Sequence, residues 1–291
     1  MVRPAFDPVH AALSGALVGH VLTALTFAPP DALAAVSAAP RSASSIAEAA
    51  SALDVDLAFV PSWLPSAPGT VAALREVGVA PAWVVRGPLW PTLEHVGLEN
   101  GLRLTARDPD ALASQLDLQV ERSRSAVLVG MRLDVSAIVV AEDLAGNDGL
   151  LVAPDFALAE VVPRLHAVVA PAIDDGVAAV LHSDGDIRAL LPALARAGFT
   201  AVHAGGGLSR DAFERLFWAA RRLGFGVIGG ISTGDLVTPA GAVFAGTSAS
   251  LLARAGGLLI GDDGGVERAR EMRLLETAFA AARSDLPPDR L

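Results

Sequence analysis

The chain has 291 residues, of which 52% are hydrophobic and 19% charged, so it carries enough apolar side chains to form one large core. It contains no Cys and no Tyr, and all 22 of its basic residues are Arg, which excludes disulfides, thiolate metal ligands, a catalytic phenol, Schiff-base lysines and Walker A nucleotide sites. The formal net charge of −10 argues against a nucleic-acid partner, and we expect a cytoplasmic protein with no membrane partner.

The first apolar stretch spans residues 11–28 and is interrupted by His20. The residues before it carry one basic side chain, Arg3, which is offset by Asp7, and this is a weak charge pattern for a signal peptide. The stretch is also marginal in length for a membrane span. We therefore expect a short helix followed by a buried strand in this part of the chain.

Beyond this stretch, short apolar runs alternate with longer helical patterns, and the runs stop at Gly, Pro or polar residues. Eight strands are predicted, at residues 20–27, 56–61, 82–87, 137–142, 178–182, 201–203, 226–230 and 257–261. Eight strands alternating with helices predict an α/β fold with a single domain over residues 1–291, a (β/α)8 TIM barrel. A doubly wound open sheet has the same alternation and stays open as the alternative.

Four of the helical patterns have clear limits. Residues 209–223 are predicted to form a helix with Ser209 as its N-cap, and residues 187–197 one that ends at Gly198. Helices are also predicted for residues 155–172 and 266–283.

In either architecture the active site lies at the carboxyl ends of the strands. Acidic and imidazole side chains follow the predicted strands at Glu142, Asp143, His182, Asp184, Asp262 and Asp263. His182 and Asp184 are two residues apart, so on an extended strand they point to the same side.

These residues admit two kinds of chemistry. His182, Asp184, Asp262 and Asp263 form a candidate metal site of one imidazole and several carboxylates. His182, Asp184, Glu142 and Asp143 are equally candidates for catalytic acid–base work. The alternative is structural: Asp184 would cap the next helix, and the Asp262–Asp263 pair would form a turn.

A second group of strand-end residues is predicted to bind substrate: Arg86, Asn147, His203, Thr233 and Trp63. The guanidinium of Arg86 can hold a carboxylate through two hydrogen bonds, and Trp63 can form an apolar wall. The glycine run at 205–207 could offer backbone N–H groups to an anion, although its spacing is not that of a dinucleotide-binding loop.

Two segments resemble the uroporphyrinogen decarboxylase superfamily, which includes methylcobalamin:coenzyme M methyltransferases. They read AEDLAGNDGLLVAPDFALAEVVPRLHAVV and AAVLHSDGDIRALLPALARAGFTAVHAGGG. Three shorter segments, VVRGPLWPTLEHVGLENGLRL, GVIGGIST and GGLLIGDDGGV, resemble other blocks of the family. The resemblance covers residues 52–283, leaves residues 1–50 as a divergent N-terminal segment, and implies a (β/α)8 barrel.

The departures from the family pattern bear on function. The decarboxylase's N-terminal arginine motif is missing, since only Arg3 precedes Arg41, and the chain has no Tyr to supply the decarboxylase's tyrosine. Where the methyltransferases bind zinc through H-x-C, this chain has His182-Ser183-Asp184, and the later cysteine falls near Gly264. A site of one imidazole and carboxylates would suit a harder metal or none.

The resemblance therefore implies an enzyme of methyltransferase type in corrinoid-linked one-carbon metabolism. Its implied cofactors are methylcobalamin or another corrinoid as methyl donor, or a divalent metal, and its implied partners are a small-molecule substrate, a corrinoid protein and a second copy of the chain. Three further functions stay open: a lyase of the uroporphyrinogen decarboxylase type that acts on a carboxylated substrate, a metal-dependent enzyme of another class such as a hydrolase or class II aldolase, and a binding subunit without catalytic activity.

Overall fold

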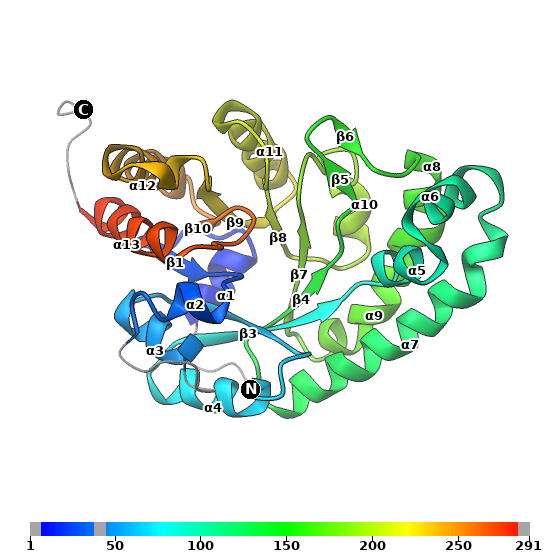
Figure 1. The fold of residues 1–291 in the computed structure, drawn as a ribbon, viewed down its shortest axis with the longest axis horizontal. Helices are drawn as coiled ribbons and strands as arrows, with labels where there is room; N and C mark the ends of the chain where they lie inside the picture. The colour runs from blue at the N-terminus through cyan, green and yellow to red at the C-terminus, as the bar shows by residue number, and fades with distance from the viewer. Residues whose placement is uncertain (1–6, 38–44, 285–291) are drawn as a thin grey trace.

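The computed structural model describes residues 7–37 and 45–284, and it forms a closed barrel of eight parallel strands surrounded by helices (Figure 1). The strands are β1 (Leu22–Leu25), β2 (Leu57–Pro61), β3 (Ala80–Arg86), β4 (Ala137–Ala141), β7 (Ala178–Ser183), β8 (Ala201–Ala204), β9 (Gly226–Ile231) and β10 (Leu258–Asp262). They pair in chain order, and β10 closes the ring by pairing with β1. The predicted (β/α)8 barrel is confirmed, and the closed ring excludes the open sheet.

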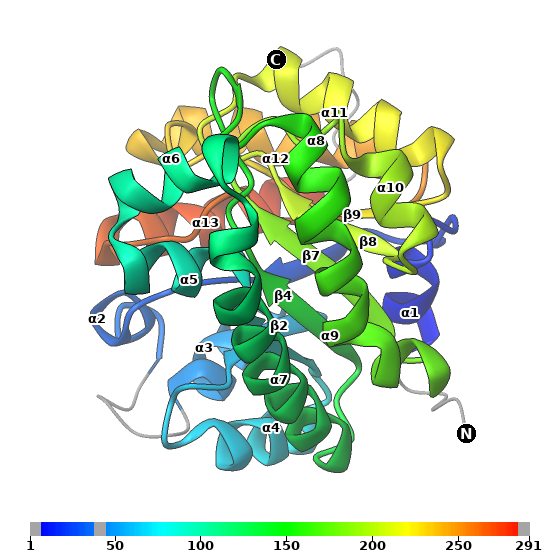
Figure 2. The same cartoon turned by 90° about the vertical axis from the view of Figure 1, so that its right-hand side faces the viewer.

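Helices connect the strands and pack on the outside of the barrel (Figure 2). They are α1 (Asp7–Leu13), α2 (Pro30–Leu33), α3 (Ser45–Ala52), α4 (Ala67–Glu76), α5 (Leu89–Val96), α6 (Leu98–Arg107), α7 (Asp110–Arg132), α8 (Pro154–Phe156), α9 (Val162–Asp174), α10 (Leu191–Arg196), α11 (Arg210–Arg222), α12 (Pro239–Ala253) and α13 (Ala269–Arg283). A hairpin of β5 (Ala145–Gly146) and β6 (Gly149–Leu150), a π-helical turn η2 (Ala157–Val161) and a 3₁₀ turn η3 (Asp235–Val237) complete the fold.

All eight predicted strands correspond to barrel strands, with small differences in their limits. The first is shorter than the predicted 20–27, because His20 lies in an exposed bend and the pairing with β2 and β10 involves only Leu22–Leu25. The short helix predicted in this part of the chain is α1, which begins earlier, at Asp7.

The predicted helix 187–197 begins later than expected, at Leu191. Its first turn is replaced by a loop in which Asp186 accepts hydrogen bonds from the backbone N–H of Arg188, at 3.1 Å, and from its guanidinium. A local side-chain bond of this kind competes with helix formation. Ser209 is the N-cap of α11, as predicted, and accepts from the backbone N–H of Ala212.

One helical run, Pro154–Asp174, is long and apolar enough to cross a membrane by length and composition. Here it packs along α7 and against β4 and β7 as one of the barrel's outer helices. Within it, Pro163 cannot donate the usual helical hydrogen bond, and the preceding residues Ala157–Val161 are wound as a π-turn.

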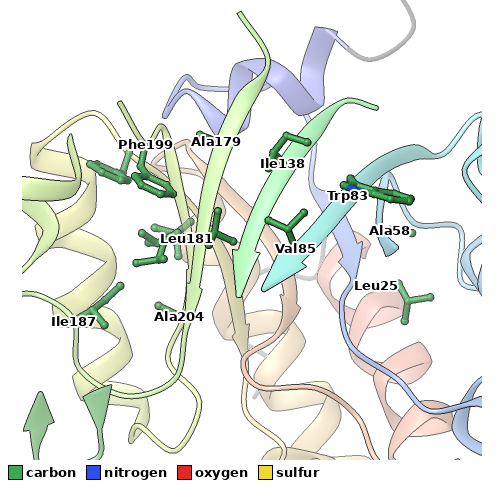
Figure 3. Close-up of a cluster of buried hydrophobic side chains, with 14 of the residues drawn as sticks. Leu25, Ala58, Trp83, Val85, Ile138, Ala179, Leu181, Ile187, Phe199 and Ala204 are labelled. Carbon is green, nitrogen blue, oxygen red and sulfur yellow. The ribbon is translucent and has the colours of Figure 1, made fainter. Parts of the chain in front are cut away.

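Alternation along the strands creates two apolar layers. Side chains that face outward, such as Trp83, Val85, Ile138 and Leu181, pack between the strands and the helices (Figure 3). Inward-facing side chains fill the barrel, and they include Leu57, Phe59, Val84, Val139, Val180, Ile228 and Leu259. Helix α1 contributes Val9, Ala12 and Leu13 to this inner core, so it closes one end of the barrel. The other end, at the carboxyl ends of the strands, carries the polar residues.

Candidate active site

A cavity of about 360 Å³ opens at the carboxyl ends of the strands. It is lined by Phe27, Trp63, Arg86, Trp90, Pro91, Glu94, Ala141, Asp143, His182, Asp184 and Gly264. Its floor is set by strand register, because Ala141 on β4 pairs with His182 on β7, which in turn pairs with His203 on β8. Since inward-facing positions alternate, the inner-core residues Ala178 and Val180 place His182 inside the barrel as well.

Asp143, His182 and Asp184 converge on this cavity. Each offers one potential ligand atom, and the three atoms lie within 4.8 Å of one another. The Nε2 of His182 is 3.8 Å from the Oδ1 of Asp143, too far for a hydrogen bond. The backbone N–H of Asp184 donates to the same oxygen at 3.3 Å, which ties the ends of β4 and β7 together. The structure thus brings together three residues predicted for the site.

Asp184 carries the clearest sign of an unmet interaction. Its Oδ1 is buried and has no hydrogen-bond partner among the described residues. Burial raises the pKa of this carboxyl to about 6, with further contributions from Asp143 and Asp262. A buried oxygen without a partner is costly, which makes the Asp184 carboxylate a candidate ligand for a cation or acceptor for a donor.

The glycine run at 205–207 explains how Asp184 is packed. A Cβ at Gly206 would overlap the carboxylate of Asp184 and lie 2.6 Å from its Cγ, so a larger residue at this position would displace the Asp184 side chain. A Cβ at Gly207, where φ is +78°, would overlap the Oδ1 of Asn147. The run therefore supports Asp184 and the β5–β6 hairpin through close backbone approach.

Below the cavity, His182 stacks against a second buried histidine. The Nδ1 atoms of His182 and His203 are 2.9 Å apart, and the Nε2 of His203 is 2.9 Å from the backbone oxygen of Asp262. The rings of Phe27 and Phe59 pack around this pair, with centroids 4.8 Å from His182 and 5.3 Å from His203 respectively. Burial lowers the pKa of both histidines, so both rings are neutral near pH 7.

Asp262 lies on the outward-facing side of β10, like Leu258 and Ile260, which belong to the outer core. Its carboxylate accepts from the hydroxyl of Thr26, at 2.6 Å, and from the backbone N–H of Gly265. Its hydrogen bonds therefore connect β10 with the end of β1 across the closure of the barrel. In this position Asp262 lies behind His203 rather than on the cavity.

Asp263 is buried beside Asp262 and does not line the cavity. Burial raises its pKa to about 8, and the charge of Asp262 adds to the rise. Its carboxylate is held by backbone N–H groups, including that of Thr233. Thr233 itself, predicted to bind substrate, is exposed beyond the end of β9 and outside the cavity lining.

Glu142 follows the last residue of β4, and its side chain points away from the cavity that Asp143 lines. Its carboxylate accepts from the backbone N–H groups of Leu89 and Trp90, at 2.6 and 2.7 Å, and so caps the start of α5. Burial raises its pKa to about 8, although both hydrogen bonds work against this rise. Glu142 thereby positions the first turn of α5, which carries Trp90 in the cavity wall.

The rim of the cavity contains Arg86 and Trp63, both predicted to bind substrate. The Arg86 guanidinium lies 5.5 Å from the centre of the Trp63 ring and 3.6 Å from the Glu94 carboxylate. Asn147 lies in the exposed turn of the β5–β6 hairpin, against the glycine run and outside the cavity lining. His203 lies beneath the floor, where it contacts His182 rather than the cavity.

Sequence reasoning left out several of the residues that shape this site, among them Phe27, Glu94 and Thr26. Alternation could have identified the capping role of Glu142 and the inward direction of Asp143, because only one of two adjacent strand residues faces the barrel. The contact between Thr26 and Asp262 spans 236 positions and depends on barrel closure, which no local pattern reveals.

A second cavity of about 880 Å³ adjoins the first, and the two share Phe27, Trp63 and Gly264. Its walls are mostly apolar and include Pro29, Leu33, Ile46, Leu64, Pro65 and Val266. Its charged lining residues, Asp31 and Glu267, are both acidic.

Comparison with known proteins shows the fold. No family model and no curated protein matches the chain. Among solved structures it is similar to a methyltransferase from Methanosarcina mazei, with 16% identity, a TM-score of 0.75, and coverage of 96% of this chain and 98% of that one. It is more loosely similar to the glycoside hydrolase domain of PelA from Pseudomonas aeruginosa (13% identity, 86% and 96% coverage, TM-score 0.48). An oxaloacetate acetylhydrolase gives 12% identity, 89% and 80% coverage, and a TM-score of 0.47. The chain is thus an α/β TIM barrel whose outline matches a methyltransferase barrel over almost its whole length.

Proposed function

We propose that this protein is an enzyme that holds a divalent metal ion with Asp143, His182 and Asp184, and that it transfers a methyl group to an acceptor bound beside that ion. The observation that carries the proposal is the convergence of these three side chains on one cavity, with the Asp184 Oδ1 left without a partner. The site lies at the carboxyl ends of barrel strands, where TIM-barrel enzymes have their active sites.

The donor set and spacing suit a metal ion. Ligands on a tetrahedral zinc ion at about 2.1 Å stand roughly 3.4 Å from one another. The three potential ligand atoms lie within 4.8 Å of one another, so small side-chain rotations would bring them to that spacing. Three protein ligands leave a position open for a substrate atom. One imidazole and two carboxylates favour zinc or a harder divalent ion over a thiolate-selective one.

When bound, the ion would supply Lewis-acid chemistry, lowering the pKa of an acceptor hydroxyl or thiol so that it attacks as the anion. The protein's own residues would provide the geometry. Asp184 is held by the close approach of Gly206, and Asp143 is fixed by the backbone N–H of Asp184. Trp63 and Trp90 form walls that limit access of water to the acceptor.

The methyl-transfer part of the proposal rests on two likenesses that agree. The sequence segments resemble the uroporphyrinogen decarboxylase superfamily with its corrinoid-linked methyltransferases, and the fold matches a methyltransferase barrel. Within the proposal, the methyl donor is a methylated corrinoid, free or carried by a corrinoid protein; the acceptor anion would take the methyl group as a cation, and the electron pair of the broken cobalt–carbon bond would stay with the corrinoid as cob(I)alamin. The adjoining apolar cavity gives room for the part of a substrate that does not react.

A decarboxylase acting on a polycarboxylate is less well supported. That chemistry needs several cations around the substrate. Among the described residues that line the cavity, Arg86 is the one arginine, and it already pairs with Glu94. Arg188, the second candidate in the sequence, pairs with Asp186 at 2.6 Å in the loop after β7.

The test combines metal analysis with methyl transfer. The purified protein and the variants Asp143→Asn, His182→Gln and Asp184→Asn would be assayed for bound zinc and for demethylation of methylcobalamin with small thiol and alcohol acceptors. Asp148→Asn, an exposed carboxylate in the nearby hairpin turn, is the matched control. We expect stoichiometric metal and turnover in the unsubstituted protein and in the control, and loss of both in the three variants. Metal binding without demethylation by any acceptor would overturn the methyl-transfer part, and absence of metal would overturn the site.

A further inference from the structure

The two buried histidines form a hydrogen-bonded chain whose direction is fixed at one end. A backbone carbonyl can only accept a hydrogen bond, so the Nε2 of His203, 2.9 Å from the oxygen of Asp262, must carry a proton. His203 is completely buried against the apolar ring of Phe59, and such burial favours the neutral ring, whose Nδ1 is then without a proton and can only accept.

The protonation of His203 fixes that of His182. The Nδ1 of His182 lies 2.9 Å from the Nδ1 of His203, and one of these two atoms must donate. Since the Nδ1 of His203 is the acceptor, the Nδ1 of His182 carries the proton. Burial favours the neutral ring for His182 as well, and in that form its Nε2 keeps a free lone pair; this is the atom that faces Asp143 at 3.8 Å.

We infer that His203 is a positioning residue that holds His182 in the Nδ1–H tautomer, so that the Nε2 lone pair of His182 points at the site formed with Asp143 and Asp184. The inference deepens the proposed metal site and rests on it for its purpose. A metal ligand needs an unprotonated nitrogen, and histidine ligands usually donate their other N–H to an oxygen acceptor. Here a second histidine takes the place of that acceptor.

The residues around His182 and His203 hold the two rings in this orientation. Asp262 is itself held by the hydroxyl of Thr26 and the backbone N–H of Gly265, so its carbonyl cannot easily turn away from His203. The edge-on ring of Phe59 and the tilted ring of Phe27 flank the pair. Both apolar rings favour neutral over charged imidazoles.

The first experiment needs no substitution and no metal. Histidine ring nitrogens labelled with ¹⁵N would be observed in the metal-free protein at pH 8, where protonated and unprotonated ring nitrogens give well-separated shifts. We expect a protonated Nδ1 and an unprotonated Nε2 for His182, and the reverse for His203. His166 is an internal reference, because its Nδ1 lies 2.9 Å from the backbone oxygen of Ala197 and must donate. A protonated Nε2 on His182 would overturn the inference, whatever the protein does with metals.

The second experiment uses matched variants of His203. In His203→Asn the amide oxygen is bonded to Cγ, as Nδ1 is in histidine, so it can still accept a hydrogen bond from His182. In His203→Gln the amide nitrogen takes the place of Nε2, and the acceptor is lost. We expect the Asn variant to keep the Nδ1–H tautomer of His182, and the Gln variant to lose it.

Zinc affinity, measured by titration calorimetry, should follow the tautomer. We expect it to fall about 10- to 100-fold in His203→Gln and much less in His203→Asn, as for other residues that orient a metal ligand. Equal losses in the two variants would assign His203 a packing role alone and contradict the inference. If the unsubstituted protein binds no zinc, the proposed function fails, while the ¹⁵N measurement still decides the inference.

Discussion

Replacing Asp184 with Asn should stabilise the metal-free protein at pH 8. Burial raises the pKa of this carboxyl from 3.8 to about 6. The native state therefore binds more protons than the unfolded state between those values, and its stability falls as the pH rises through that window. This rise in pKa corresponds to roughly 3 kcal/mol, because each pKa unit is worth about 1.36 kcal/mol. Partial exposure of the group to solvent reduces this to about 1–2 kcal/mol.

The assay is urea denaturation of the protein treated with a chelator, at pH 8 and at pH 4. The Asn variant should gain about 1–2 kcal/mol at pH 8, and the gain should shrink toward zero at pH 4, where the carboxyl is protonated in the native state. Asp186→Asn is the matched control in the same loop. Its pKa is lowered by hydrogen bonds from Arg188, so this variant should lose stability at pH 8. The reasoning is refuted if Asp184→Asn destabilises the metal-free protein at pH 8.

Added zinc should make the unsubstituted protein more stable than Asp184→Asn, the reverse of their order without metal. A ligand that binds only the native state stabilises it by about 2.7 kcal/mol at a concentration 100 times its Kd. The unsubstituted protein should show this gain, and Asp184→Asn should show little or none. Parallel gains in both proteins would mean that zinc binds elsewhere.

Two further predictions concern the support of the site. Gly206→Ala should push the Asp184 carboxylate out of place and weaken zinc binding at least tenfold in calorimetry. Gly69→Ala, which has open space around it, is the control and should leave zinc affinity unchanged. Equal zinc affinities of the two variants would contradict the role of Gly206 in packing Asp184. Thr26→Val removes the 2.6 Å hydrogen bond to the buried Asp262 carboxylate and should cost about 1–3 kcal/mol of unfolding free energy in urea melts, so that an unchanged midpoint would count against it.

Local sequence patterns predicted the barrel well, because each strand is a short buried run that ends at a turn residue. The spacing of His182 and Asp184 predicted that their side chains point the same way, and both line the cavity, although β7 ends at Ser183, before Asp184. Extending the same alternation to Glu142 and Asp143 would have separated them, since Glu142 shares the outward face with Val140. Strand parity thus distinguishes a helix cap from a residue of the cavity.

Other features depend on contacts that no local pattern contains. The delayed start of α10 follows from the bond between Asp186 and Arg188, which competes with the first helical turn. The place of Asp262 depends on the pairing of β1 with β10, which brings Thr26 to its carboxylate. The sequence showed that acidic groups follow the last strand, but only closure of the barrel puts one of them behind a histidine.

A chain of hydrogen bonds joins the seam between β1 and β10 to the candidate ligand. Thr26 on the β1 side holds Asp262 on β10, the carbonyl of Asp262 holds His203, and His203 holds His182. Weaker contacts between β1 and β10 would therefore change the orientation of the His182 ring, and with it the direction of its Nε2, through Asp262 and His203. It follows that a variant weakened at the seam, such as Thr26→Val, should lose zinc affinity at urea concentrations well below those that unfold the barrel. A variant equally destabilised at a site remote from the seam should keep its affinity until unfolding begins.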